Sequence, residues 1–276
     1  MITQQQKAET FRKLHQGPGA FVIPNPWDAG TAKILADLGF QALATTSAGF
    51  AFSLGRPDGD GVIGREDTLA NFASIVQATD LPVSADLQAG FGRAPETVAE
   101  TIRLAAEAGL VGGSIEDATG DAAQPIQDIG RAKERIVAAV EAARALKFPF
   151  TLTARAENFL WGRPDLADTI QRLQAFQEAG ADVLYAPGLK SSEEIASVVK
   201  AVDRPVNVLM GARTRPLTVA DLAQLGVRRI SVGSGLYLAA LGAFHRAAKD
   251  LQENGIASFA DGAMPFDALN TLFAGK

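Results

Sequence analysis

Short apolar runs alternate with longer segments of helical periodicity along most of the chain. The apolar runs are bounded by turn residues and are rich in residues that favour strands, which predicts β-structure. Eight such runs occur, at residues 20–24, 41–47, 81–87, 111–117, 148–154, 181–186, 205–210 and 229–233. The pattern therefore predicts eight strands.

The segments between these runs carry helix signals. Residues 27–38, 95–108, 129–146 and 166–179 have helical spacing. Glycines that suit a helix C-cap precede the following strand at Gly39, Gly109, Gly180 and Gly226. This repeated order predicts that each helix ends just before a strand begins.

The order of elements indicates an α/β fold. Strands that are apolar almost throughout are typical of a parallel sheet covered by helices. Eight β-α units in 276 residues fit a closed (β/α)8 barrel of the TIM type better than an open doubly wound sheet, the other fold that the pattern allows. We predict one domain over residues 1–276, with an N-terminal helix, a barrel over about 20–250 and a C-terminal helical extension over about 251–276.

The expected C-terminal extension has an apolar stripe, formed by Phe266, Leu269, Leu272 and Phe273 at helical spacing. A stripe of this kind beyond a closed barrel predicts contact with another subunit in a homo-oligomer. The alternative is a helix that lies on its own barrel.

Polar side chains gather where the predicted strands end. The stretch "SADLQAGFG" places Asp86 and Gln88 two residues apart, so on a strand both would face one place. The residues at strand ends are Asn25, Asp28, Thr45, Thr46, Ser47, Asp86, Gln88, Glu116, Asp117, Arg155, Glu157 and Tyr185. In a barrel these ends form one mouth, where barrel enzymes hold their sites. A helix cap at Asp28, or a Glu157–Arg155 pair that only holds the rim, is the alternative for single members.

Composition narrows the possible functions. The net charge is −5 and no basic tract or long apolar stretch occurs, so neither nucleic acid nor a membrane is an expected partner. Cysteine is absent, and the two histidines, His15 and His245, lie in helical patterns near the chain ends, which disfavours a catalytic triad or a zinc site. The start, "MITQQQKAETFRKL", lacks the layout of a signal peptide, so we expect a cytoplasmic protein.

Three carboxylates at the mouth predict a metal site. Asp58, Asp86 and Glu116 would repel one another without a cation or protons, and oxygen ligands suit Mg²⁺. Arg155 offers a planar fork for a carboxylate or an enolate oxygen, and Thr46 and Ser47 could donate hydrogen bonds to the same ligand. A metal that chelates a 2-oxo acid opposite an arginine would stabilise an enolate.

Two other barrel chemistries are less well supported. A Schiff-base aldolase needs a lysine on a strand, and the nearest lysine, Lys190, follows a strand in a loop. A sugar-phosphate enzyme would use "GARTR" and "VGSG" to hold phosphate, but Arg213 and Arg215 could equally be solvated rim residues. The first alternative lacks its nucleophile, and the second rests on common glycine-rich strand ends.

Four motifs resemble the isocitrate lyase and phosphoenolpyruvate mutase superfamily over about residues 20 to 250: "IPNPWDAGTAKILADLGFQALATTSAG", "PVSADLQAGFG", "GGSIEDATG" and "TLTARAENF". The resemblance implies a barrel with magnesium at its mouth that binds 2-oxo or 2-hydroxy carboxylates. It also implies that Asp86 is the principal metal ligand, that Asp58 and Glu116 hold metal-bound water, and that Arg155 is the substrate arginine. Thr46, Ser47 and Ala48 correspond to the segment that grips the substrate carboxylate. In this family a C-terminal helix is exchanged between subunits, so the resemblance implies such an exchange over about 251–276 and a homo-oligomer, a dimer or a tetramer.

The chain departs from this family at several places, among them Ala44 and Pro187, where lyases tend to have tyrosine and glutamate. Two departures bear most directly on the chemistry. Gln88 stands where a second aspartate is usual, and the loop "DATGDAAQPIQD" after the fourth strand lacks the cysteine, histidine and lysine of the lyases. We expect a lyase or decarboxylase of a small 2-oxo or 2-hydroxy carboxylate, with Gln88, Glu157 and Tyr185 as further substrate contacts. The alternatives are a 2-oxo acid binding protein without turnover and a P–C bond mutase or hydrolase. We also predict that the loop over 118–128 is a mobile lid.

Overall fold

The computed structural model describes residues 2–59 and 61–275, and eight parallel strands form its centre. The strands are β1 Phe21–Ile23, β2 Leu43–Ala44, β3 Val83–Asp86, β4 Gly112–Glu116, β5 Thr151–Arg155, β6 Val183–Tyr185, β7 Val206–Leu209 and β8 Arg229–Ser231. Seven lie wholly within the predicted runs, and β5 extends one residue beyond its run to Arg155. Their order in the sheet is β1-β8-β7-β6-β5-β4-β3-β2.

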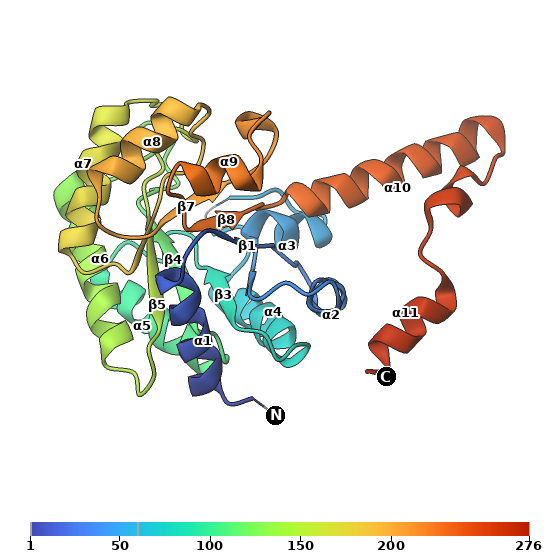
Figure 1. Cartoon of the computed structure of the whole chain (residues 1–276), viewed down its shortest axis with the longest axis horizontal. Helices are drawn as coiled ribbons and strands as arrows, with labels where there is room; N and C mark the ends of the chain where they lie inside the picture. The colour runs from blue at the N-terminus through green and yellow to red at the C-terminus, as the bar shows by residue number, and fades with distance from the viewer. Residues whose placement is uncertain (1, 60, 276) are drawn as a thin grey trace.

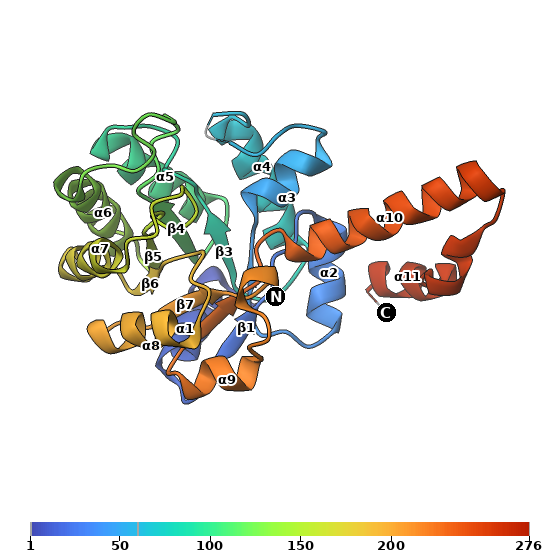
Figure 2. The same ribbon diagram turned by 90° about the horizontal axis from the view of Figure 1, so that it is seen from above.

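Most of the helices surround the strands on the outside (Figures 1 and 2). The helices of the described residues are α1 Gln4–Gln16, α2 Ala29–Asp37, α3 Ser47–Ser53, α4 Arg65–Gln77, α5 Pro95–Glu107, α6 Ile129–Arg144, α7 Leu166–Glu178, α8 Ser192–Ala201, α9 Val219–Gln224, α10 Gly235–Asn254 and α11 Phe266–Phe273, with short 3-10 helices η1 Ala212–Thr214 and η2 Ser258–Gly262. The predicted (β/α)8 barrel of the TIM type, with its N-terminal helix, is confirmed. None of the described helices is both long enough and apolar enough to cross a bilayer.

The seam between β1 and β2 closes the barrel. The backbone N–H of Ala44 donates to the Pro24 carbonyl at 3.0 Å. Nearby, the Asn25 side chain donates to the Thr45 carbonyl at 2.9 Å and accepts from the N–H groups of Val232 and Gly233, at 3.0 and 2.9 Å. Asn25 therefore joins the ends of β1, β2 and β8, so its polarity at a strand end has a structural role.

Caps set the limits of the helices much as the sequence predicts. The four glycines that follow α2, α5, α7 and α9 have positive φ angles, between 85° and 100°, which is the left-handed conformation that suits glycine after a helix. The Asp28 side chain accepts from the Thr31 N–H at 2.7 Å and caps α2. Asp28 therefore has the capping role that the sequence left as its alternative.

One predicted strand ends early. The run over 41–47 continues as β2 only to Ala44, because the Thr46 hydroxyl accepts from the Gly49 N–H at 3.2 Å and caps α3. A threonine that satisfies a free N–H of the first turn favours the start of a helix. Thr46 and Ser47 consequently belong to a strand-to-helix turn at the mouth.

Helix α1 covers the end of the barrel opposite the mouth. Its Ala8 and Phe11 pack with Phe21, Ala42 and Val111, which lie at or just before the first residues of β1, β2 and β4. A separate and larger apolar cluster lies between the strands and the outer helices. Burial of apolar side chains at both places stabilises the closed barrel.

His15 of α1 provides a test of this end of the barrel. Burial first, then the positive charge of Arg229, lowers the pKa of His15 to about 3. The ring contacts those of Phe11 and Phe21, and its Nδ1 lies 2.8 Å from the Phe11 carbonyl. His15 thus packs against the aromatic rings at this end of the barrel.

We expect the His15→Leu variant to resist mild acid better than the parent. Between about pH 6 and 4 the unfolded chain binds a proton at His15 that the folded chain does not. The free energy of unfolding therefore falls by up to about 1.4 kcal/mol for each unit of pH drop. The free energy of unfolding, measured by denaturant titration between about pH 6 and 4, should fall less steeply with decreasing pH in the variant, by up to about 1.4 kcal/mol for each unit of pH. Parallel profiles would contradict the prediction.

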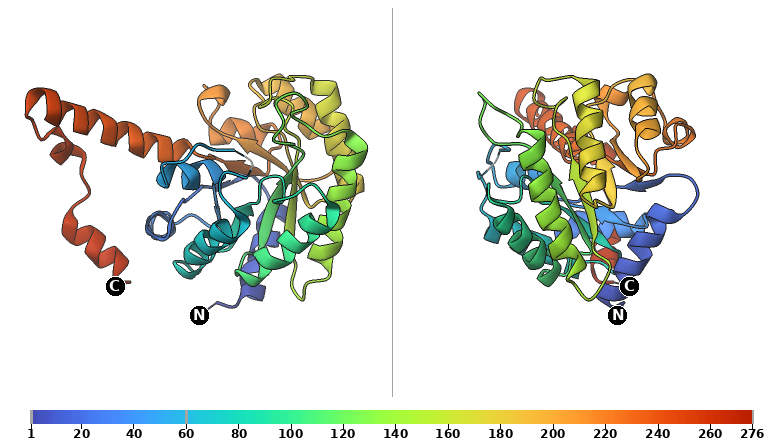
Figure 3. Two further views of the ribbon diagram at one scale, coloured as in Figure 1. Left: turned by 180° about the vertical axis from the view of Figure 1, so that it is seen from behind. Right: turned by 90° about the vertical axis from the view of Figure 1, so that its left-hand side faces the viewer.

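The C-terminal segment projects from the barrel as an arm, formed by α10, η2 and α11 (Figures 1 and 3). Within the described part of α10 only Tyr237 is buried, and its ring meets that of Trp27 edge to face at 5.0 Å. Farther along, Phe244 and Phe266 are 71% and 79% exposed. The arm touches the barrel again where Lys33 of α2 donates to the Phe273 carbonyl at 3.0 Å. The arm thus leaves large apolar side chains uncovered.

Candidate functional site

The mouth of the barrel is built around Arg155, the last residue of β5. Its guanidinium Nη1 lies 3.1 Å from Glu116 Oε2 and 3.5 Å from Asp86 Oδ1, and its Nε contacts Glu157 Oε1. All four side chains are at most 17% exposed. The structure therefore brings together one arginine at the end of β5 and three carboxylates, of which two end β3 and β4 and the third follows β5.

The α3 turn completes one side of this cluster. The backbone N–H and the hydroxyl of Ser47 both donate to Asp86 Oδ2, at 3.1 and 2.8 Å. Thr46 is buried and caps α3, as described above, while Ala48 follows Ser47 on the same helix. Ser47 thus orients Asp86, and of the three predicted carboxylate-gripping residues it makes the closest contact with the acidic cluster.

The carboxylates of the mouth are crowded. Burial raises the pKa of Glu116 well above its ordinary value, although Arg155 opposes the rise. Partial burial and the negative charge of Asp86 also raise the pKa of Asp58. Both shifts mean that holding these groups ionised together costs free energy. Asp58 therefore lies within the electrostatic reach of the cluster, from a loop that precedes α4.

Two adjacent cavities meet at Arg155. The outer cavity, about 330 Å³, is lined by Ser47, Asp58, Gly59, Gln88, Glu116, Ala118, Gly120, Arg155, Glu157, Leu160 and Trp161. The inner cavity, about 60 Å³, is lined by Ile23, Asn25, Ala44, Thr45, Thr46, Ser84, Ala85, Asp86, Ser114, Arg155, Tyr185, Asn207, Arg229, Ser231 and Gly233. The outer volume falls in the range of small-molecule sites.

Gln88 does not share a strand with Asp86. Strand β3 ends at Asp86, and Gln88 has a φ of 50°, a turn conformation that is uncommon for residues other than glycine. The two side chains accordingly border different cavities, Asp86 the inner one and Gln88 the outer one. The Gln88 Oε1 atom is buried and has no hydrogen-bond partner among residues 2–59 and 61–275. This oxygen therefore has an unused capacity to accept a hydrogen bond.

Tyr185 lies beside Arg155. Its ring centroid is 5.4 Å from the guanidinium carbon of Arg155, and burial raises its pKa to about 12. A guanidinium over an aromatic face is held by the ring quadrupole. Tyr185 is therefore a neutral group, and its ring helps to hold the Arg155 guanidinium in place.

A buried ion-pair network behind the mouth escaped sequence analysis. Asp117 accepts from the Glu157 N–H at 2.8 Å and pairs with Arg172 of α7 at 2.9 Å. Arg172 also pairs with Asp168 at 2.7 Å and donates to the Gln127 carbonyl. The network fixes the backbone that carries Glu157. Arg172 lies in a helical pattern, so only its position in space reveals the role.

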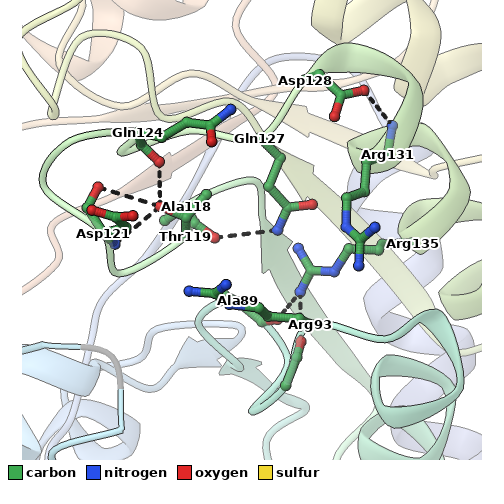
Figure 4. A pocket seen from close by; sticks show the side chains of 11 residues that line it. Ala89, Arg93, Ala118, Thr119, Asp121, Gln124, Gln127, Asp128, Arg131 and Arg135 are labelled. Carbon is green, nitrogen blue, oxygen red and sulfur yellow. Dashed lines mark hydrogen bonds between the residues drawn. The ribbon is translucent and has the colours of Figure 1, made fainter.

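A second arginine holds the turns that follow β3 and β4. Arg135 of α6 is 1% exposed, and it donates to the carbonyls of Ala89 and Gly92 and, at 3.3 Å, to that of Glu116. Figure 4 shows its guanidinium pointing at the turn that contains Ala89. Arg135 therefore supports the backbone on both sides of Gln88 and Glu116.

The loop after β4 forms a small hairpin. Ala118 and Ile126 make an antiparallel bridge, and the Thr119 N–H donates to the Pro125 carbonyl at 3.0 Å. Residues 120–124 at its tip are exposed, and Gly120 lines the outer cavity. The hairpin is thus anchored at its base and borders the cavity with its tip.

We expect magnesium with oxalate to slow proteolysis within 120–124. A ligand in the outer cavity would hold the tip closed and reduce its exposure to protease. Cleavage within the exposed segment 255–264 serves as the internal control, since that segment lies away from the mouth. Equal rates at the tip with and without both ligands would contradict the lid prediction.

The donor set at the mouth fits a hard cation bound through few direct ligands. In the described part of the chain no three acidic or histidine side chains are grouped so as to hold a metal by themselves. Asp86 instead has Ser47 on one oxygen and Arg155 near the other. Carboxylate oxygens with retained waters are typical of Mg²⁺ sites. One direct carboxylate, with others acting through water, suits this arrangement.

The residues that a Schiff-base aldolase or a phosphate-binding enzyme would need do not lie at the mouth. Lys190 is exposed just before α8, and it does not line either cavity. Arg213 and Arg215 are exposed around η1 and likewise line neither. The Schiff-base and phosphate-grip hypotheses therefore gain no support.

The fold and the mouth define a (β/α)8 barrel protein with an arginine and several carboxylates at the carboxyl ends of its strands. Comparison with known proteins shows the family to which it belongs. The family model of phosphoenolpyruvate phosphomutase matches residues 11–252. The chain therefore belongs to this family, and the predicted membership of the isocitrate lyase and phosphoenolpyruvate mutase superfamily is confirmed.

Three relatives indicate the range of the family. A Burkholderia cenocepacia structure described as a "putative lyase/mutase" is 60% identical, with a TM-score of 0.96 over 98% of this chain and 97% of that chain. The oxaloacetate decarboxylase of Bradyrhizobium diazoefficiens is 29% identical over 90% of this chain and 86% of its own length. Oxaloacetate acetylhydrolase, solved with its product oxalate, is 26% identical, with a TM-score of 0.89 over 99% and 96% of the two chains.

Proposed function

We propose that this protein is a magnesium-dependent lyase or decarboxylase that breaks a C–C bond in a small 2-oxo carboxylate through an enolate. The observation that carries the proposal is the contact of Arg155 with Asp86, Glu116 and Glu157 beside the outer cavity. Two relatives, a decarboxylase and an acetylhydrolase of oxaloacetate, support the substrate class.

The excess of negative charge at the mouth supports the proposal of a bound magnesium ion. Asp58, Asp86, Glu116 and Glu157 face the single positive charge of Arg155, and the raised pKa values of Asp58 and Glu116 reflect the excess of negative charge and burial. A divalent cation would offset that excess. Asp86 would hold the ion directly, and Asp58 and Glu116 would hold its waters. The bound ion would supply Lewis-acid polarisation of the 2-oxo group.

The chain's own groups would bind and orient the substrate. Arg155 would donate to the oxygen that gains charge as the enolate forms, and its planar fork suits that oxygen or a carboxylate. Ser47 and Thr46 at the α3 turn would receive the substrate carboxylate, and the Gln88 amide would contact the rest of the substrate. Glu157 and Tyr185 would keep Arg155 in place.

The state of the possible bases favours decarboxylation over retro-aldol cleavage. Cleavage of a 2-hydroxy acid needs a base to remove the hydroxyl proton, whereas loss of carbon dioxide from a 2-oxo acid needs none to start. Tyr185, with a pKa of about 12, is a neutral donor near pH 7. Glu157 is buried in contact with Arg155. Neither group is prepared to act as that base.

A substrate screen tests the proposal. Oxaloacetate, dimethylmalate, methylisocitrate and phosphonopyruvate would be assayed for release of pyruvate, succinate or phosphate, with and without magnesium, alongside calorimetric binding. We expect magnesium-dependent turnover of oxaloacetate. Binding without turnover of any compound would identify a 2-oxo acid binding protein, and phosphate release would identify P–C bond chemistry. Either result would overturn the proposal.

We also propose that the C-terminal arm packs against another subunit in a homo-oligomer. The exposed apolar side chains of the arm, including Phe244, Phe259 and Phe266, support this. Sedimentation should show a dimer or tetramer for the full chain and smaller particles after truncation before Asp261. A monomeric full chain would end the proposal, and the truncated chain serves as the matched comparison.

A further inference from the structure

A row of polar side chains crosses the inside of the barrel from the mouth. The strand register places Arg155 beside Tyr185, Tyr185 beside Asn207, and Asn207 beside Arg229. Arg155 lies over the Tyr185 ring, and Arg229 Nε donates to Asn207 Oδ1 at 2.9 Å. Arg229 is the first residue of β8. The row therefore runs from Arg155 at the mouth to Arg229 deeper in the barrel.

The row borders the inner cavity, whose strand-borne lining is unusually polar for a barrel interior. Ser84, Ser114 and Ser231 line it together with Asn207 and Arg229, where branched apolar residues commonly fill such barrels. Ser231 accepts from the Asn207 amide at 3.0 Å. The volume of about 60 Å³ exceeds the ~10–15 Å³ that one water-sized sphere needs. The cavity therefore has room for a small polar guest.

Arg229 has no negative partner in the described part of the chain. Its side chain is buried, no Asp or Glu among residues 2–59 and 61–275 forms an ion pair with it, and its Nη1 has no acceptor there. Burial lowers the pKa of Arg229 only to about 10, so the group is charged at neutral pH. A buried charge is costly unless an opposite charge compensates it.

The neighbouring groups cannot supply that charge. His15, the titratable group whose pKa Arg229 lowers, stays neutral, and Tyr185 is also neutral at pH 7. The carboxylates Asp86, Glu116 and Glu157 already lie around Arg155. Within the inner cavity, the carboxylate of Asp86 disfavours a second anion at the Arg155 end, which leaves the Arg229 end as the favourable position.

We propose that the inner cavity binds a small monoanion, of the charge and size of chloride, beside Arg229 and Asn207. The guanidinium would supply the charge, and the Asn207 amide and the hydroxyl groups of the lining would donate hydrogen bonds. One buried positive charge matches a monoanion. The anion is a fixed counterion of the barrel interior, and it is separate from the substrate that Arg155 is proposed to bind.

Bromide locates the site directly. Crystals of the full chain grown with sodium bromide in place of chloride would be measured at the bromine absorption edge. We expect an anomalous peak in the inner cavity in contact with Arg229. Solvent density there without anomalous signal would show water instead of an anion and would overturn the proposal. This measurement needs only the wild-type protein.

A matched pair of variants tests the energetic role. Chloride should raise the Tm of the parent by a few degrees relative to gluconate at equal ionic strength, because a ligand that binds only the folded state stabilises it. The rise should persist in Arg228→Met, which removes the same charge one residue earlier, where Arg228 contacts the Gly19 carbonyl. It should vanish in Arg229→Met. An equal chloride effect in all three proteins would overturn the proposal, and if Arg229→Met fails to fold, the bromide map decides.

Discussion

Replacing Asp86 by alanine should abolish magnesium affinity and turnover together. Asp86 is the proposed direct ligand, and Ser47 holds one of its oxygens with two hydrogen bonds. Without this carboxylate the ion would lose its charged anchor, and the waters held by Asp58 and Glu116 would not replace it. Calorimetric titration with magnesium and the oxaloacetate assay would measure the two losses.

Matched variants separate charge from shape at this position. Asp86→Asn keeps an oxygen for Ser47 but removes the charge, so it should fold as the parent does and still lose magnesium. Gln88→Ala should retain magnesium and weaken substrate binding, because Gln88 borders only the outer cavity. Gln88→Asp should tighten magnesium by adding a negative charge near the ion. If Asp86→Ala bound magnesium as tightly as the parent, Asp86 would not be a metal ligand and the proposed site would be wrong.

Replacing Arg155 by lysine should lower kcat/KM by about 10²–10³-fold, the effect typical of losing one donor to a developing oxyanion. Lysine keeps the positive charge that Glu116 and Glu157 require, but it lacks the planar fork. Steady-state kinetics with oxaloacetate would measure the loss. Activity within threefold of the parent would contradict the assigned role.

A second variant measures the structural part of the Arg155 role. Arg155→Met would leave three largely buried carboxylates without their partner, and breaking a buried pair in this way costs about 3–5 kcal/mol. Arg155→Lys should therefore unfold close to the parent in urea, while Arg155→Met unfolds at a clearly lower concentration. Equal midpoints would show that the acidic cluster does not depend on Arg155 for stability.

Most of the fold could be predicted from the sequence because the signals for strands and helices are local. Strand and helix periodicity, with glycines such as Gly109 and Gly180 after helices, depends on neighbours within a few residues. All eight strands were therefore found, and the barrel followed from their number and order. The main error in strand extent, at Thr46 and Ser47, arose where a capping hydroxyl outweighed the strand pattern.

The candidate site could be predicted in part for a related reason. In parallel strands the carboxyl ends meet at one edge, so Asp86, Glu116 and Arg155 could be assigned to one mouth from sequence order alone. Gln88 was misplaced because a positive φ ends the alternation of side chains after Asp86. The Leu160 and Trp161 walls of the outer cavity were missed because their loop has no periodic signal.

The sequence by itself determined the class of fold, the family and the residue types available for chemistry, because these depend on local periodicity and on motifs of a few residues. Only the tertiary structure decided which side chains face one another. The contact of Arg172 with Asp117 spans 55 residues, and the row from Arg155 to Arg229 depends on the register of four strands. Such contacts are set by the closure of the barrel, which brings distant residues together through packing that no local pattern encodes.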